Sequence, residues 1–315
     1  MIDVYYEDGS SNKFITLSET KVEDLLQKIA IKISLTVEKE AFSLFESSAQ
    51  IGVQQDHLLT PNEIVPTPTQ FTKLLFKRRN YFSLNLVDPI AVHMTFIQLR
   101  EDVLRGHYVL DQTDFLRLAA LDMQITFGNP SASGRKAGFL TSANLIPRFL
   151  PKWAIPVKKE VVWEKLILDE YQRLIEKPIA REFEGKVRYI EALRSMASEQ
   201  FGCVYFEGSD VTLPKSPHPA ILGVNKEGIF LYWIAGDEKE KKSQPNILVR
   251  SNAFSQIIGW AAHVSSSTFV YSLPGPEDGT SVDFSFESPL FAEIPSFCQE
   301  VVDFVLKAAD HNSAS

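Results

Sequence analysis

The spacing of apolar residues divides the chain into three regions, and the first covers residues 1–82. Short runs that alternate apolar and polar residues lie on both sides of one run with the helical period of about 3.6. That helical run follows the pattern Thr20-x-x-Glu23, a capping box typical of a helix N-terminus. Its apolar positions are Val22, Leu25, Leu26, Ile29 and Ile33. A hairpin, one packed helix and returning strands predict a small ubiquitin-like β-grasp lobe.

The second region, residues 83–199, keeps the helical period throughout. Apolar residues recur at helical spacing in three stretches, which are 88–127, 160–176 and 179–197. A loop rich in Gly, Ser and Pro and then the stretch "PRFLPKWAIPVKK" (147–159) separate the first two. These patterns predict an all-helical lobe.

In the third region, residues 200–310, the period changes to two. Seven short runs with turn residues between them predict an antiparallel sandwich or barrel. An amphipathic helix then closes the chain, with Ile294, Phe297, Val301, Phe304, Val305 and Ala308 on one face. Seven strands and a closing helix are the pattern of the PH/PTB superfold, and residues 311–315 are expected to form a tail.

Composition and charge exclude several classes of function. A hydrophobic content of 44% and a charged content of 23% are those of a globular protein. The formal net charge of −8 argues against bulk nucleic-acid binding. Two cysteines are too few for a disulfide framework, and the N-terminus lacks the regions of a signal peptide. Since no apolar run approaches the ~20 residues of a membrane span, we expect a cytoplasmic protein that meets membranes only at their surface.

No catalytic or metal-binding motif is found. The six histidines lack HExxH spacing, and neither GxxxxGK, GxGxxG nor CxxC occurs. Ser10-x-x-Lys13 and Ser18-x-x-Lys21 match a fragment of a β-lactamase motif, but they lie in a turn and a cap without partner motifs. Both cysteines, Cys203 and Cys298, sit in apolar patterns typical of buried thiols. We expect no enzyme activity, no cofactor and no metal.

Positive charge is concentrated in two stretches of this acidic chain. Residues 134–165 carry seven basic residues against two acidic ones, Glu160 and Glu164, which interrupt the run. Residues 66–82 carry four basic residues and no acidic one. Such segregation would orient the protein on an anionic bilayer, where each Lys or Arg contributes roughly 1 kcal/mol. The candidate lipid-binding residues are Lys77, Arg78, Arg79, Arg135, Lys136, Arg148, Lys152, Lys158 and Lys159.

Two interpretations of the basic stretch stay open. In one, Phe149 and Trp153 sit at the level of the lipid headgroups, as aromatic residues prefer. In the other, the stretch is a solvated loop, Phe149 and Trp153 belong to the core, and the lysines only keep the surface soluble.

Several strings of the sequence resemble the FERM family. "LREDVLRGHYVL" resembles the early helix and turn of a FERM helical lobe, and "GKVRYIEALRSM" followed by "FGCVYFEG" resembles the passage into the third lobe. "AGFL…LIPRFLPKW…KK" and "KVRYIEAL" look like talin, whereas "ILGVNKEGIFL" and "FSQIIGW" look equally like myosin and plant kinesin tails. The resemblance implies an α+β, multi-lobed fold with an acyl-CoA-binding-protein-like helical lobe. Talin heads and myosin tails carry additional domains in front, which leaves the parent architecture open.

The resemblance also implies a function. A talin-like FERM module is an adaptor that links the membrane to the actin cytoskeleton, at the plasma membrane or cytoskeleton, through phosphoinositides and the cytoplasmic tail of a receptor. The segment of the helical lobe that holds Lys152, Lys158 and Lys159 matches the one that orients talin-like proteins on the membrane. The first alternative is a cargo-binding FERM module of a myosin or kinesin tail. A second is a regulatory FERM module of a kinase or phosphatase.

A peptide site is expected on the third lobe. PTB-like domains add an extended peptide between an exposed strand and the C-terminal helix. The strand would be "FSQIIGWAA" (254–262), and in talin-like FERM domains a tryptophan in it contacts the receptor tail. The candidate residues are Ile257, Ile258, Gly259, Trp260, Ala261, Phe297, Val301 and Phe304. A core tryptophan and a bulge glycine are the alternatives for Trp260 and Gly259.

Overall fold

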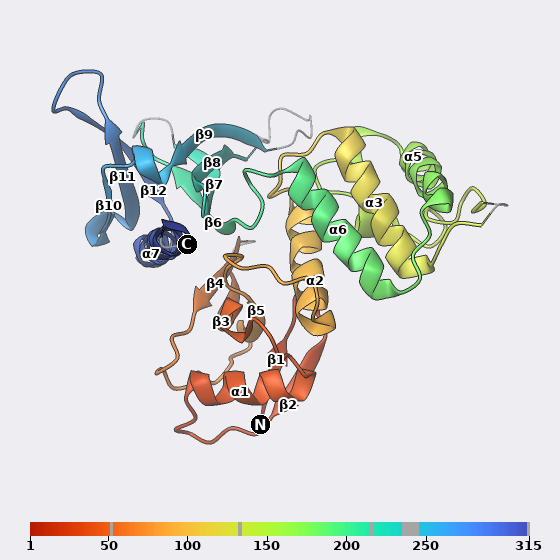
Figure 1. Ribbon diagram of the computed structural model, residues 1–315, viewed down its shortest axis with the longest axis horizontal. Helices are drawn as coiled ribbons and strands as arrows, with labels where there is room; N and C mark the ends of the chain where they lie inside the picture. The colour runs from red at the N-terminus through yellow and green to blue at the C-terminus, as the bar shows by residue number, and fades with distance from the viewer. Residues whose placement is uncertain (51–52, 132–133, 214–216, 235–245, 314–315) are drawn as a thin grey trace. The chain divides into compact units, whose positions relative to one another are not determined.

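The chain folds into two compact units, and each is described separately. The computed structural model describes residues 1–50, 53–131, 134–213, 217–234 and 246–313 (Figure 1). One unit combines Met1–Leu84 with Gly202–Ile234 and Leu248–Ser315, and it contains two β-sheets. The other is helical and holds Asn85–Phe201 with Asn246 and Ile247.

The first lobe is a mixed five-stranded sheet covered by one helix. Its elements are β1 (Ile2–Tyr5), β2 (Ser11–Phe14), α1 (Val22–Ile33), β3 (Phe42–Gln50), β4 (Val53–Leu58) and β5 (Thr72–Arg78). The strands lie in the order β2-β1-β5-β3-β4, and β1 and β5 run parallel. The buried residues of α1, which include Leu25 and Ile29, follow the predicted helical spacing.

The predicted capping box does not form at the start of α1. Lys21 is the N-cap and no side chain caps the helix, while the Thr20 hydroxyl accepts a hydrogen bond from the Leu17 N–H. The N–H groups of Val22 and Glu23 instead donate to carbonyls of the loop before β5. The tertiary structure therefore satisfies the helix N-terminus that the local motif was expected to cap.

The helical unit is built from four long helices and several short ones. They are α2 (Pro89–Arg105), α3 (Gln112–Phe127), α4 (Ile146–Phe149), α5 (Glu160–Arg173) and α6 (Glu182–Met196), with the 3₁₀ turns η2 (Ile155–Val157) and η3 (Leu174–Glu176). Asp88 is the N-cap of α2, and its side chain accepts hydrogen bonds from the N–H groups of Ile90 and Ala91. The C-cap is Gly106, with φ +83°. The α3 helix packs against both α5 and α6.

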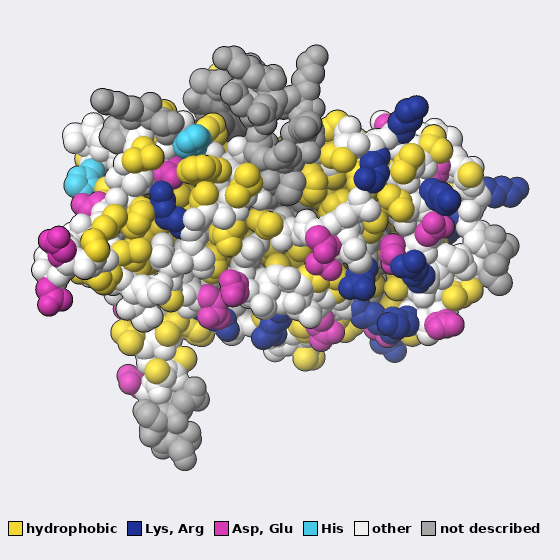
Figure 2. Space-filling model, turned by 90° about the horizontal axis from the view of Figure 1, so that it is seen from above, with side chains coloured by type: hydrophobic (Ala, Val, Ile, Leu, Met, Phe, Trp, Pro, Cys, Tyr) yellow, Lys and Arg dark blue, Asp and Glu magenta, His cyan; other side chains and the backbone are white. Residues whose placement is uncertain are grey.

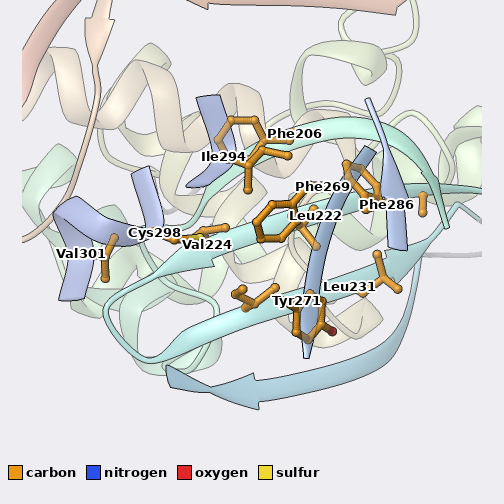
Figure 3. Close-up of a cluster of buried hydrophobic side chains, with 12 residues drawn as sticks. Phe206, Leu222, Val224, Leu231, Phe269, Tyr271, Phe286, Ile294, Cys298 and Val301 are labelled. Carbon is orange, nitrogen blue, oxygen red and sulfur yellow. The ribbon is translucent and has the colours of Figure 1, made fainter. Parts of the chain in front are cut away.

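The third lobe is a seven-stranded antiparallel sheet closed by a helix. Its strands are β6 (Val204–Asp210), β7 (His218–Asn225), β8 (Gly228–Trp233), β9 (Ile247–Ala253), β10 (Gly259–His263), β11 (Thr268–Pro274) and β12 (Ser281–Glu287), in the order β10-β11-β12-β6-β7-β8-β9. The closing helix, α7 (Glu293–Ser313), buries Ile294, Cys298 and Val301 against Phe206, Phe269 and Phe286 of the sheet (Figure 3). The predicted fold class is confirmed: the chain has a mixed-sheet lobe, a helical lobe and an antiparallel β-lobe with a C-terminal helix. No helix in the described ranges has the length and apolar character that a membrane crossing requires.

The α7 helix also contacts the first lobe. The Glu293 carboxylate lies 2.5 Å from His57 Nδ1 and accepts from the Leu58 N–H at 3.3 Å. Arg79 pairs with Glu300. The Phe82 ring stacks on Phe304 and Phe297, with centroid distances of 4.7 and 6.3 Å. One helix thus holds the two sheets of this unit together.

We expect the Phe82→Ala substitution to lower the free energy of unfolding by about 2 kcal/mol, because it removes both aromatic stacks between α7 and the end of the first lobe. Urea unfolding of the whole chain measures this. The matched control is Phe71→Ala, whose ring is 64% exposed and whose loss is expected to cost less than about 0.5 kcal/mol. Equal effects of the two substitutions would contradict the importance of the stack.

Candidate functional site

The basic residues of the helical unit lie on its surface. Lys136, Lys152, Lys159 and Lys165 are exposed, as are Arg135 and Arg148. Lys158 is half-buried, and its ammonium lies 5.2 Å from the centre of the Trp163 ring. In the part of the chain that the structure describes, no carboxylate lies within ion-pair distance of any of these seven. Figure 2 shows Lys and Arg gathered on the helical unit, mixed with apolar and some acidic side chains.

The Glu164 carboxylate does not interrupt this basic surface, contrary to the expectation from sequence. Its side chain turns inward, and the residue is only 3% exposed. It accepts hydrogen bonds from the N–H groups of Gly138 (2.9 Å), Leu140 (2.6 Å) and Thr141 (3.4 Å) and from the Thr141 hydroxyl (3.1 Å). Of the two acidic residues in the stretch, only Glu160 is exposed.

Hydrogen bonding decides the charge of Glu164. Burial raises the pKa of this carboxyl, but the hydrogen bonds from Leu140, Gly138 and Thr141 together outweigh burial and hold the pKa below its ordinary value. The carboxylate is therefore ionised at neutral pH, and the N–H groups of the loop before α4 stabilise its charge by hydrogen bonding.

The aromatic residues of the basic stretch belong to the core. Phe149 is 3% exposed. Trp153 is half-buried and stands edge-on to Phe115 at 5.6 Å between ring centroids. It also packs against Gly106, where an added Cβ would lie 2.9 Å from the indole. This corrects the interpretation that places Phe149 and Trp153 among lipid headgroups.

Three aliphatic side chains that sequence reasoning missed are exposed instead. Val157, Val161 and Val162 are 48%, 69% and 45% exposed. The signal was present in the sequence: Trp163, Ile167 and Tyr171 mark the buried side of α5 at helical spacing, and Val161 and Val162 lie off it.

Arg135 and Arg148 form a separate basic cluster at the C-terminal end of α3. Arg135 donates to the Phe127 carbonyl at 3.0 Å and lies 4.7 Å from the centre of the Phe139 ring. Arg148 donates to the Thr126 hydroxyl at 3.3 Å. Lys158 lies near the other end of α3, because Trp163 beneath it contacts Phe115 in the first turn of that helix. The 16 residues of α3 span about 24 Å at 1.5 Å per residue, so the basic surface has two ends.

The three candidate residues of the first lobe do not form a free positive surface. Lys77 lies 2.5 Å from Asp56 and 3.7 Å from Glu7. The Arg78 side chain is fully buried, pairs with Glu38 at 3.0 Å and donates to two backbone carbonyls. Arg79 pairs with Glu300 on α7. Each charge has a carboxylate partner, which argues against Lys77, Arg78 and Arg79 as lipid contacts.

The predicted peptide strand is shorter than expected, and it lies at an edge of the sheet. Residues 254–256 form a 3₁₀ turn, and β10 begins only at Gly259. The strand pairs with β11 on one side and is the last in its sheet. Ile258 is 61% exposed and Ala261 is also exposed. An edge strand of this kind can accept a further strand.

The space around Gly259 is open, whereas the side chains of Trp260 and Ile257 are half-buried. A Cβ on Gly259 would meet nothing within 4 Å. Trp260 is half-buried, packs against the core of the lobe and stands 5.8 Å from the Phe254 ring. Ile257 is likewise half-buried against this core. The edge is therefore open at Gly259, whereas Trp260 is partly a core residue.

The three candidate residues of α7 are occupied by the protein itself. Val301 is fully buried in the core, and Phe297 and Phe304 stack on Phe82. By helical spacing, Val302 and Leu306 lie on a different side of α7, where Leu306 is 59% exposed. The α7 helix contacts β10. Phe297, Val301 and Phe304 are engaged with other parts of the protein, whereas the Leu306 side chain is exposed.

Comparisons with known proteins identify relatives of this chain. Residues 83–206 match the FERM central domain. Talin-A of Dictyostelium discoideum is 23% identical over 314 residues, which is 97% of this chain and 11% of that protein. Talin-B of the same organism is 28% identical over 232 residues, which is 73% of this chain and 8% of that protein. Kinesin-like protein KIN-14I of Oryza sativa subsp. japonica is 25% identical over 260 residues, which is 73% of this chain and 20% of that protein. The chain thus spans only a small part of these relatives.

Solved structures share the fold at low sequence identity. The human Myosin 7b C-terminal MyTH4-FERM domain, in complex with the harmonin-a PDZ3 domain, matches with a TM-score of 0.68 and 19% identity, covering 96% of this chain and 60% of that one. The complex of the FERM and C-terminal domains of Drosophila Merlin matches with a TM-score of 0.67 and 16% identity, covering 100% and 99%.

We expect Glu164→Gln to lower the free energy of unfolding at pH 7 by about 1–3 kcal/mol, because an amide replaces a carboxylate that accepts four hydrogen bonds. The folded-state pKa of Glu164 is lowered, so its contribution is present above the ordinary value of about 4.3 and is lost as the pH falls through the folded value. Denaturant unfolding between pH 7 and pH 3 tests this. The difference between the two proteins is expected to shrink on acidification, and a constant difference would contradict the assignment.

Proposed function

Because this chain is a FERM domain, a module that is usually non-catalytic, we propose that it acts as an adaptor that joins an anionic membrane surface to a protein partner. The lipid contact is supported by the group of surface cations on the helical unit, none of which has a described carboxylate within ion-pair distance. The ligand they favour is a multiply charged lipid headgroup such as a phosphoinositide. The likeness to Talin-A and Talin-B supports a talin-like adaptor, and a link to the actin cytoskeleton is part of this proposal.

The lipid contact is carried by the helical unit alone. The proposed contact residues are Arg135, Lys136, Arg148, Lys152, Lys158 and Lys159, to which Lys165 is added. Lys77, Arg78 and Arg79 are left out because each is already paired. Two basic ends separated by the length of α3 would contact the bilayer at two places and fix the orientation of this unit.

A second contact is proposed at the edge strand β10, which would bind the cytoplasmic tail peptide of a receptor or of a cytoskeletal or motor partner. The free edge of β10 and the exposed Leu306 on α7 support it. Main-chain hydrogen bonds between β10 and the peptide would give affinity, and contacts of the peptide side chains with α7 would give specificity. Two weak contacts on one chain reinforce each other through effective concentration.

The main alternative is a cargo module of a motor tail, which would use the protein contact without the lipid contact. The likeness to the Myosin 7b MyTH4-FERM domain, whose structure was solved in complex with the harmonin-a PDZ3 domain, favours it. The two functions differ in one measurable property, which is the affinity for anionic vesicles.

We expect simultaneous charge reversal of Lys152, Lys158 and Lys159 to Glu to weaken binding to vesicles that contain phosphatidylinositol bisphosphate by at least about 100-fold. Losing three contacts of roughly 1 kcal/mol each already accounts for this. Co-sedimentation at fixed salt measures it. The matched control reverses Lys13, Lys28 and Lys226, which are exposed elsewhere and change the net charge equally. If both variants lose the same affinity, or if the wild type binds neutral vesicles as well as anionic ones, the lipid half of the proposal fails.

We expect Ala261→Lys to weaken peptide binding about tenfold or more, because a lysine on an edge strand opposes the addition of another strand. An array of synthetic cytoplasmic-tail peptides of adhesion receptors, probed with both proteins, measures it. Val264→Lys is the control, since Val264 is 80% exposed but lies in the turn after β10. Peptides that bind both variants and the wild type equally would rule out the β10 edge.

A further inference from the structure

The first turn of α5 presents an apolar ridge inside the basic surface. Val157 ends the η2 turn, and Val161 and Val162 follow in the first turn of α5. Val161 is 69% exposed, and the other two are nearly half-exposed. These three residues are called the valine ridge below. No described part of the chain covers it, so the side chains are available to another surface.

Helical geometry places lysines around the valine ridge. Val161 and Lys165 are four residues apart, and Val162 and Lys165 three, so all three lie on one side of α5. Lys158 and Lys159 lie between Val157 and the helix, and Lys159 is its N-cap. Glu164 points away into its hydrogen bonds with residues 138–141. The result is a short amphipathic surface with an aliphatic centre and a lysine-rich rim, in which Glu160 and Asp169 are the exposed acidic neighbours among the described residues of α5.

We propose that the valine ridge inserts into the outer acyl region of an anionic membrane while Lys158, Lys159 and Lys165 contact the headgroups. This inference rests on the proposed lipid-binding function and gives it a non-electrostatic part. Lysine stems are long enough to lie along an apolar surface and keep the ammonium in water. Peripheral proteins of this kind gain affinity from buried apolar area and from attraction to anionic lipids together.

The chemistry of the patch favours lipid over a protein partner. Protein interfaces are depleted in lysine and enriched in aromatic residues and arginine. Here the rim is lysine, the centre is valine, and the nearby aromatic residues Trp153 and Trp163 are turned into the core. The cationic rim is complementary to a surface of negative charge that spreads in two dimensions, as lipid headgroups do.

The two parts of the contact depend differently on salt. Raising the salt concentration screens the attraction of lysines for headgroups, because the Debye length falls from about 10 Å at 0.1 M to about 3 Å at 1 M. Burial of aliphatic surface is not screened. A chain that binds through lysines alone should leave the membrane completely at high salt, whereas the inserted ridge should retain part of the binding.

The first test is the double substitution V161T/V162T, which keeps the β-branched shape and replaces one methyl group of each residue by a hydroxyl. Binding to phosphatidylcholine vesicles with phosphatidylinositol bisphosphate is expected to fall about five- to tenfold at 0.15 M salt. The fraction retained at 0.5 M salt is expected to fall further. The control is Ile175→Thr, whose side chain is 41% exposed in η3 at the other end of α5, and it should bind as the wild type does.

The second test locates the ridge directly. Both native cysteines are buried, and burial raises the pKa of the Cys298 thiol, so an exposed cysteine can be labelled selectively. A polarity-sensitive fluorophore on the V161C variant is expected to shift to the blue on anionic vesicles and to be quenched by brominated lipid. The same label on the I175C variant is expected to do neither.

The outcomes separate this inference from the function on which it rests. If the wild type does not bind anionic vesicles, both the proposed lipid-binding function and the proposed insertion of the valine ridge are wrong. A second outcome is that the wild type binds in a lysine-dependent way, V161T/V162T binds equally well and the label on V161C stays in water. In that case insertion of the valine ridge is wrong and the lipid-binding function stands. Reduced binding of V161T/V162T with a blue shift at V161C supports insertion.

Discussion

The hydrogen bonds of the buried Glu164 carboxylate decide which charges the basic stretch 134–165 presents at the surface. It accepts hydrogen bonds from Gly138, Leu140 and Thr141 of the loop before α4, and so ties that loop to α5. The same bonds remove a negative charge from the middle of the basic stretch. The exposed charged and larger aliphatic side chains of this stretch are then lysines, Arg135, Arg148, three valines and one acidic residue, Glu160. The inward turn of Glu164 thus leaves Glu160 as the exposed acidic residue of a stretch that holds seven basic ones.

The α7 helix packs against two different parts of its unit. One side contacts the first lobe through Glu293, Glu300 and the aromatic residues that meet Phe82. Ile294, Cys298 and Val301 face the core of the third lobe (Figure 3). On a further side of the helix, the Leu306 side chain is exposed. The proposed peptide site would use a helix that is already packed against the rest of its unit, which would limit the entropy lost on binding.

Much of the fold could be predicted from the sequence, because each lobe has its own apolar period. Less of the site could be predicted, because partners of charged side chains come from distant parts of the chain. Lys77 pairs with a residue 21 positions away, Arg78 with one 40 away and Arg79 with one 221 away. No local pattern contains such pairs, so three neutralised cations looked like free ones. The inward turn of Glu164 is equally long-range, whereas the exposure of Val161 and Val162 follows from helical spacing and could have been found.

The central claim is that the helical unit, through the start of α5, meets an anionic membrane. Hydrogen exchange of the chain with and without phosphoinositide-containing vesicles tests it most directly, since it reports on each segment at once. The account predicts slower amide exchange at residues 157–165 with these vesicles, unchanged exchange with neutral vesicles, and no change at residues 72–79. Protection at 72–79 without protection at 157–165, while the chain is bound to the vesicles, would contradict it.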